Sequence, residues 1–229
     1  MVFWVSESMD GLGVSDSTEL DVSPEVVWDV LRHVGLYHKV FATCHRVDVY
    51  DRSSKTGKAI LAEEASHDYV IQGGDRYKEY RIVEGRSFEF PTSVTQLEHY
   101  NNPAMKKTVE SGDDNFDAES WVFGLATKLW QSHGTSTHVL TRIGADSCRL
   151  TISYGMSPMG CYGSLYLWLF RRRIAREGLI SIRSDLQDIS RAATLLQQQQ
   201  QQQQELTTSQ SNIDADNGPT NTMASKLPL

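Results

Sequence analysis

The stretch that decides the fold is Glu19-Leu20-Asp21-Val22-Ser23-Pro24-Glu25-Val26-Val27-Trp28-Asp29-Val30-Leu31. Its first part alternates, with Leu20 and Val22 on one face and acidic side chains on the other, which is typical of a half-buried strand. Ser23 then offers a helix cap, Pro24 suits the first helical position, and Glu25 favours the positive end of the helix dipole. The stretch predicts a strand that runs directly into an amphipathic helix.

Strand patterns dominate the chain after this helix. Beyond a second short helix expected at residues 36–41, β-type runs cover residues 44–50, 58–65, 77–83, 88–97, 121–130, 137–143 and 149–156. Residues 101–117 are polar and predict a long loop. Because the strands are not interleaved with helices, the order disfavours a doubly wound α/β fold.

After Pro158 the apolar side chains change from a strand period to a helix period. They recur at Leu167, Phe170, Ile174, Gly178, Ile182, Leu186, Ile189, Ala193 and Leu196. Residues three or four apart share one face of a helix. The pattern predicts a helix of about 35 residues, or ~50 Å, long enough to cross a whole sheet.

Three pieces of this order resemble the START-like superfamily (SRPBCC), in its Bet v 1-like, polyketide-cyclase/dehydrase and lipid-transport branch. Residues 19–31 resemble the opening strand and helix of that family. Residues 148–154, before Pro158, resemble its last strand, and residues 183–189 resemble its closing helix. The resemblance implies an α+β helix-grip fold. In that fold a curved antiparallel β-sheet wraps around a long C-terminal α-helix, and two short helices follow the first strand.

The chain is expected to have three parts. Residues 1–14 form an N-terminal extension, and residues 15–196 form the helix-grip domain. Residues 197–229 begin with eight consecutive glutamines and continue with small polar residues. A segment of this composition buries too little apolar surface to offset its ordering entropy, so we predict a disordered tail.

Composition narrows the classes of partner and the compartment. Asp and Glu number 29 against 22 Lys and Arg, a net charge of −7. A general nucleic-acid-binding protein needs a basic face, so no nucleic-acid partner is expected. The cysteines Cys44, Cys148 and Cys161 are too few and too scattered for a disulfide framework, and the first residues lack the pattern of a secretory signal. We therefore expect a cytoplasmic protein.

Catalytic and metal motifs do not stand out in the sequence. A nucleophile elbow is not present, because the run Gly134-Thr135-Ser136-Thr137-His138 lacks the final glycine. A phosphate loop is not present either, because Lys55-Thr56-Gly57-Lys58-Ala59 has neither the first glycine of that motif nor a Ser or Thr after Lys58. The seven histidines include no pair three or four residues apart. We expect no metal and no cofactor, and the sequence assigns no catalytic residue.

The resemblance implies an internal cavity for a hydrophobic ligand. Strand and helix periodicity place its candidate lining at Trp121, Phe123, Leu125, Leu150, Ile152, Tyr154, Leu167, Phe170, Ile174 and Gly178. The same residues would form an ordinary packed core in any α+β domain. A glycine in the middle of a helix lowers the stability of that helix, so Gly178 indicates that a backbone or a ligand approaches there.

Polar residues inside such a cavity would orient the ligand or exchange protons with it. The candidates on the strands are Arg142, His138, Glu98, Glu79, Arg81 and Tyr154. A register slip of one residue exchanges these side chains between cavity and solvent. The sequence therefore does not choose among them.

A basic cluster follows an apolar run at the start of the long helix. Arg171, Arg172, Arg173 and Arg176 come after Leu165-Tyr166-Leu167-Trp168-Leu169-Phe170. An apolar run beside a basic face can seat a protein on an anionic membrane. The alternative is a solvated helix face with acidic partners.

Together these features favour binding or transport of a small hydrophobic ligand, such as a lipid, an isoprenoid or a polyketide-like aromatic compound. A cyclase/dehydrase-like enzyme is one alternative. An interaction protein that works through its glutamine-rich tail is another.

Overall fold

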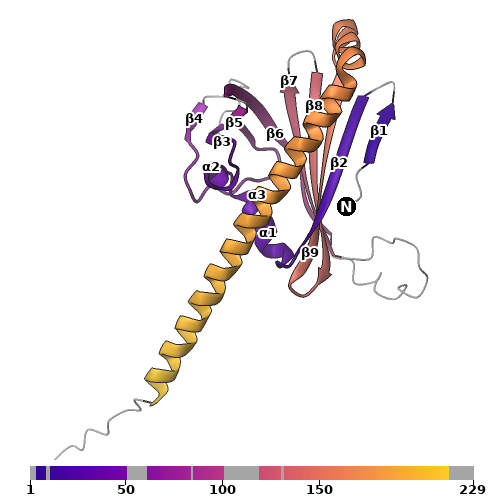
Figure 1. Ribbon diagram of the computed structural model, residues 1–229. Coiled ribbons are helices and arrows are strands. Elements are labelled where there is room, and N and C mark those ends of the chain that lie inside the picture. The colour runs from indigo at the N-terminus through magenta and orange to yellow at the C-terminus, as the bar shows by residue number, and fades with distance from the viewer. Residues whose placement is uncertain are drawn as a thin grey trace, which may run out of the picture. The chain divides into compact units, whose positions relative to one another are not determined.

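A computed structural model describes residues 4–8, 11–50, 61–83, 85–100, 119–129 and 132–216 of the chain. The elements are β1 (Trp4–Ser8), β2 (Gly11–Leu20), α1 (Pro24–Arg32), η1 (Val34–Leu36), α2 (Tyr37–Val40), β3 (Cys44–Tyr50), β4 (Leu61–Glu64), β5 (Arg76–Val83), β6 (Arg86–Tyr100), β7 (Ser120–Leu129), β8 (Ser132–Gly144), β9 (Ser147–Pro158) and α3 (Gly160–Asp216). Figure 1 shows their arrangement. The long loop predicted at residues 101–117 lies outside the described residues.

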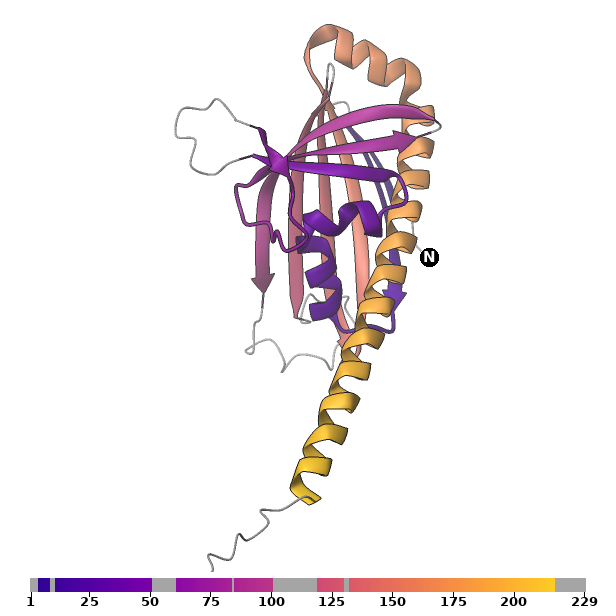
Figure 2. The same cartoon turned by 90° about the vertical axis from the view of Figure 1, so that its left-hand side faces the viewer.

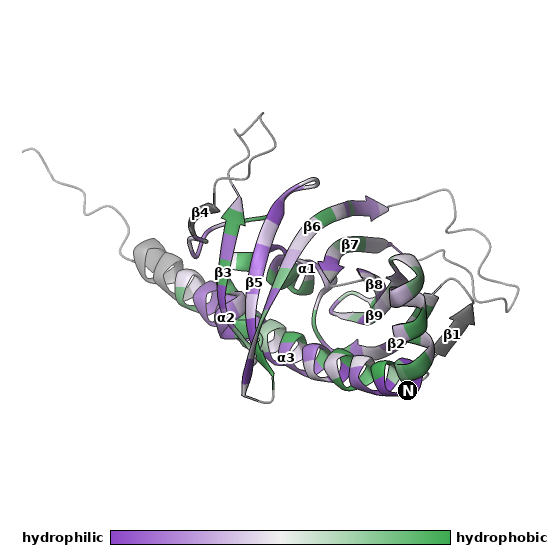
Figure 3. Ribbon diagram, turned by 90° about the horizontal axis from the view of Figure 1, so that it is seen from above, coloured by the Kyte–Doolittle hydropathy of each residue, from purple (hydrophilic) through white to green (hydrophobic). Residues whose placement is uncertain are grey.

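The described strands form one antiparallel sheet of nine strands in the order β1-β2-β9-β8-β7-β6-β5-β3-β4. Figure 3 shows the sheet curving around α1, with α3 running along its open side. The period-two pattern has its expected effect, because Trp121 and Phe123 on β7 and Leu150 and Ile152 on β9 are all buried. The predicted α+β helix-grip fold is confirmed.

The long helix α3 is held on the sheet by the predicted apolar stripe. Its fully or nearly buried side chains are Leu167, Ile182, Leu186, Ile189 and Ala193. Figure 2 shows that the first turns of α3 run across one end of the sheet before the helix changes direction and follows the strands. Within these first turns Leu167 is buried, whereas Phe170 is exposed.

Phe170, in the third turn of α3, is 42% exposed although the periodicity predicts burial. Ile174 is only half-buried. A straight helix would have placed both side chains against the sheet. The prediction that Phe170 is buried is wrong, because the first turns of α3 do not run in line with the rest of the helix.

Secondary structure extends into both segments that were predicted to flank the domain. The extension predicted at residues 1–14 contains β1 and the first part of β2, which pair with each other. At the other end α3 continues through the glutamines to Asp216, so the tail predicted to be disordered is helical that far. Glutamine is a good helix former, and a helix that is already nucleated adds further residues at little cost.

The chain forms two compact units, Met1–Thr194 and Leu195–Leu229. The first contains the sheet, the short helices and the part of α3 that carries the apolar stripe. The second contains the rest of α3, where residues 198–208 are exposed.

Gly178 is explained by packing of α3 against β2. A Cβ atom added at Gly178 would lie 3.0 Å from Cγ2 of Val14. We expect Gly178→Leu to lower the free energy of unfolding by about 1–3 kcal/mol, because leucine overpacks this contact. Urea unfolding measures the change, with Gln187→Leu at an exposed position of the same helix as the control. Equal stability of the two variants would contradict the role assigned to the contact.

Candidate functional site

A cavity of about 560 Å³ lies inside the first unit. Residues of α2, of strands β5 to β9 and of α3 between Arg173 and Asp185 line it. The strands contribute because the sheet curves, and α3 contributes because it covers the open side of that curve. The cavity is thus the space between sheet and helix that side chains leave unfilled.

The cavity opens to solvent at one end. Its lining there includes Val83 and Phe88 of the β5–β6 hairpin and Ile180 of α3, each at least 42% exposed. The lining at the other end includes Tyr37, Phe41 and His138, each at most 7% exposed. The cavity therefore has a mouth between the hairpin and α3 and a closed inner end.

An ion-pair cluster occupies the inner end. The Nε of Arg81 donates to Oε2 of Glu79 at 2.7 Å, and its Nη1 donates to Oδ1 of Asp185 at 3.1 Å. The Tyr154 hydroxyl donates to the other carboxylate oxygen of Asp185. Arg81 also stacks on the ring of Phe41, 5.0 Å from its centroid. One guanidinium from β5 thus joins the sheet to α3.

Burial changes the proton affinity of the groups around this cluster. Burial lowers the pKa of Arg81, but the carboxylates of Glu79 and Asp185 raise it, so the net pKa is well above the ordinary value. Burial, followed by the charge of Asp185, raises the pKa of the Tyr154 hydroxyl. Both groups therefore keep their protons at neutral pH.

His138 on β8 is the titratable ring beside this cluster. Burial lowers the pKa of His138 to about 4, partly opposed by the charge of Asp185. The imidazole is therefore neutral at physiological pH and can accept a hydrogen bond. Its Nδ1 is buried and has no hydrogen-bond partner among the described residues, and neither has Oγ of Ser136 on the same strand.

The sequence-predicted lining residues fall into three groups in the structure. Leu125 and Tyr154 line the cavity. Trp121, Phe123, Leu150, Ile152 and Leu167 are buried in the packed core and are not part of the lining. Phe170, Ile174 and Gly178 lie on α3 outside the lining, Phe170 exposed and the other two half-buried.

The structure also separates the polar candidates. Glu79, Arg81, His138 and Tyr154 line the cavity. Arg142 instead pairs with Glu119 and Glu25, and Glu98 accepts hydrogen bonds on the exposed part of β6.

Sequence reasoning missed Asp185, which supplies one of the two buried carboxylates. It also missed the aromatic wall residues Phe88 and Phe90. The apolar stripe of α3 carried a usable signal, because Asp185 precedes Leu186 in a helix turn that faces the sheet.

Comparison with solved structures identifies the fold. Human STARD10 superimposes with a TM-score of 0.51 at 10% identity, over 87% of this chain and 76% of that one. A START superfamily protein from Mycobacterium smegmatis gives 0.50 at 11% identity, over 80% and 98%. The chain has the START-like helix-grip fold.

A hypothetical protein of Helicobacter pylori, jhp0584, shares this helix-grip fold with a TM-score of 0.50 at 10% identity, over 78% of this chain and 86% of that one. No family model and no curated protein matches the sequence. At these identities the likeness concerns the backbone.

Two further observations concern the described part of the chain. None of its helices has the length and apolar character needed to cross a membrane. Its histidine, cysteine and acidic side chains form no group of three or more that could hold a metal ion.

Proposed function

We propose that the domain binds and carries a small hydrophobic ligand, such as a lipid, an isoprenoid or a polyketide-like aromatic compound, in this cavity. Its volume is in the range of small-molecule sites, roughly 300–1,000 Å³. Phe88, Phe90, Leu125 and Met156 supply apolar wall. A ligand's apolar body fits between these side chains.

The observation that carries the proposal is the pair of unpaired polar atoms. His138 and Ser136 both line the cavity. Nδ1 of the first and Oγ of the second are buried without a partner in the described chain. Native proteins rarely leave buried polar groups unsatisfied. A polar group on a bound ligand could supply a partner once one of these side chains turns toward it, which supports an amphipathic ligand with its polar end inside.

The charges of the inner end favour a hydrogen-bond donor on that ligand. Glu79 and Asp185 bring two carboxylates against the single guanidinium of Arg81. A ligand hydroxyl or amine can donate to the carboxylate oxygens or to the neutral imidazole of His138. We therefore favour ligands that carry such a group at one end of an apolar skeleton.

The same polar groups support a second candidate, a cyclase/dehydrase-like enzyme. A base, neutral His138, and an acid, the Tyr154 hydroxyl, both line the cavity. The pKa of His138, about 4, and that of Tyr154, well above its ordinary value, make both of them weak at neutral pH. A carrier releases its ligand unchanged, whereas an enzyme releases a product of different mass. Mass spectrometry of ligand recovered from the parent and from His138→Gln separates the two, since only an enzyme would leave a changed compound with the parent alone.

A bulky side chain inside the cavity is expected to exclude the ligand without unfolding the domain. Leu125→Trp adds bulk at the cavity wall, so its melting temperature should stay near that of the parent. Binding of a fluorescent fatty-acid or aromatic probe should weaken at least about tenfold, because tryptophan occupies the probe's volume.

The matched control is Leu140→Trp on the neighbouring strand, a fully buried side chain outside the cavity lining. There the same change should cost about 1–3 kcal/mol of unfolding free energy through overpacking. Equal destabilisation of both variants, with no probe bound by the parent and no ligand co-purifying in native mass spectrometry, would overturn the carrier proposal.

A cytoplasmic location belongs to the same proposal. All three cysteines are free thiols, and Cys44 and Cys148 are buried. Free thiols of this kind suit a reducing compartment.

A further inference from the structure

The first turns of α3 expose an unusual amount of apolar surface. We call residues 160–170 the arm. Its exposed large side chains are Tyr162 at 76%, Leu165 at 53%, Tyr166 at 47%, Trp168 at 70%, Leu169 at 57% and Phe170 at 42%. Leu167, by contrast, is buried. The arm thus packs a narrow face on the domain and leaves most of its apolar side chains outside.

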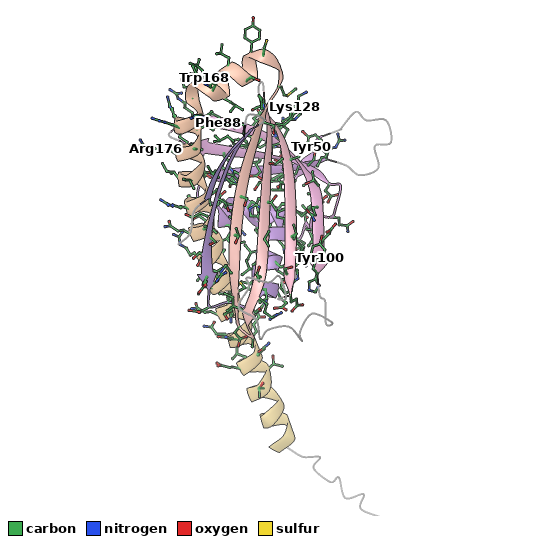
Figure 4. All side chains as sticks on the ribbon, turned by 90° about the vertical axis from the view of Figure 1, so that its right-hand side faces the viewer. Tyr50, Phe88, Tyr100, Lys128, Trp168 and Arg176 are labelled. Carbon is green, nitrogen blue, oxygen red and sulfur yellow. The ribbon has the colours of Figure 1, made fainter. Side chains whose placement is uncertain are left out.

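The arm lies at the end of the domain where the cavity opens. Figure 4 places Trp168 of the arm and Phe88 of the β5–β6 hairpin at the same end, with Tyr100 further toward the other. The hairpin adds Ile82, Val83 and Phe88 as exposed apolar side chains, each between 42% and 49% exposed. Several large apolar side chains exposed at one end of a domain mark an interaction site rather than ordinary surface.

Basic side chains follow the arm directly. Residues 171–177 contain four arginines and a single glutamate, in a chain whose net charge is −7. Arg172 and Arg176 are exposed, and Arg173 pairs with Glu177 at the cavity mouth. A local positive charge that opposes the overall charge matches an anionic partner.

We propose that the arm, the tip of the β5–β6 hairpin and Arg171, Arg172, Arg173 and Arg176 dock the protein on an anionic lipid bilayer. The aromatic and leucine side chains enter the boundary between headgroups and acyl chains, and the arginines contact the anionic headgroups. Docking turns the cavity mouth toward the bilayer. The proposal concerns the outer surface and holds whether or not the cavity carries a ligand.

The decisive measurement is flotation of the full-length protein with vesicles. Vesicles of phosphatidylcholine with about a third phosphatidylserine should bind the parent, and binding should fall as salt is raised because the charges are screened. Vesicles of phosphatidylcholine alone should bind much less. A fluorophore on Cys161 reports insertion, since that thiol is exposed and burial raises the pKa of Cys44 to about 12 and of Cys148 to about 11.

Two double variants separate the apolar and the basic contributions. Arg172→Gln with Arg176→Gln should weaken binding about 25-fold, at about fivefold for each arginine near an anionic surface. Trp168→Ala with Leu169→Ala should weaken binding about tenfold or more. It should also abolish the blue shift of fluorescence that the label on Cys161 shows when the arm enters the bilayer. All four positions are exposed, so the melting temperature should not change.

The matched control is Ile143→Ala with Arg149→Gln on the β8–β9 hairpin, where both side chains are also more than half exposed. It should bind as the parent does. The proposal is overturned if the parent ignores anionic vesicles, if both arm variants bind like the control, or if phosphatidylcholine vesicles bind equally well. It is also overturned if light scattering shows a dimer that forms through Trp168 while vesicles are not bound.

Discussion

Replacing Arg81 with methionine is expected to lower the free energy of unfolding by about 3–5 kcal/mol, the largest effect of any single change considered for this domain. Arg81 is the cation between two carboxylates, Glu79 and Asp185, whose side chains are only 7% and 6% exposed. Methionine fills a similar volume but leaves both buried charges without their counter-ion. The loss therefore comes from uncompensated charge rather than from a void.

Arg149→Met is the control variant, because it removes an arginine that does not lie between buried carboxylates. Arg149 pairs with Glu19 at the surface, with side chains 55% and 65% exposed. Exposed ion pairs contribute about 0–1 kcal/mol, so this variant should unfold almost as the parent does. Chemical denaturation of both variants at neutral pH measures the contrast. Similar small losses in the two would show that the cluster at the inner end of the cavity does not join sheet and helix.

The second large effect concerns His138 and pH. Burial lowers the pKa of this imidazole from 6.5 in the ordinary side chain to about 4 in the folded protein. Between these pH values the unfolded chain binds the proton and the folded chain does not. The contribution of His138 to stability is therefore fully present above about pH 6.5 and is lost as pH falls toward about 4.

The size of the effect follows from the shift of the pKa. A difference of this size corresponds to about 3 kcal/mol. The parent should lose about that much more stability than His138→Gln when the pH is lowered through this range. His133→Gln, at an exposed position of the same strand, is the control. Parallel pH profiles of the parent and His138→Gln would contradict the burial of a neutral imidazole at this position.

The order of elements was determined by the sequence alone, because it depends on local patterns. The strand and helix of residues 19–31 could be predicted because polar and apolar side chains alternate in the first half of this stretch and follow a helical period in the second half. Ser23 and Pro24 mark the change, and the helix begins at Pro24 as predicted. The apolar faces of β7 and β9 follow from the same period-two rule.

The secondary structure at the two ends of the domain was harder to predict, because the composition of a segment does not by itself determine its conformation. The glutamine tract has no apolar face, which led to a prediction of disorder. Helix formation past Thr194 requires only that a nucleated helix continue through residues of good helix propensity. Likewise β1 forms by pairing with β2, which a search for buried faces alone does not reveal.

The composition of the cavity was decided only by the tertiary structure. Arg81 and Asp185 are 104 residues apart in the chain, and their contact depends on where α3 crosses the sheet. Arg81 and Arg142 both lie on predicted strands, yet pairing registers place the first in the cavity and send the second to Glu119. Phe170 fits the helical period but is exposed, because the first turns of α3 run in a different direction from the rest of the helix. A strand or helix period fixes which residues share a face, whereas the partner of that face depends on contacts between distant segments.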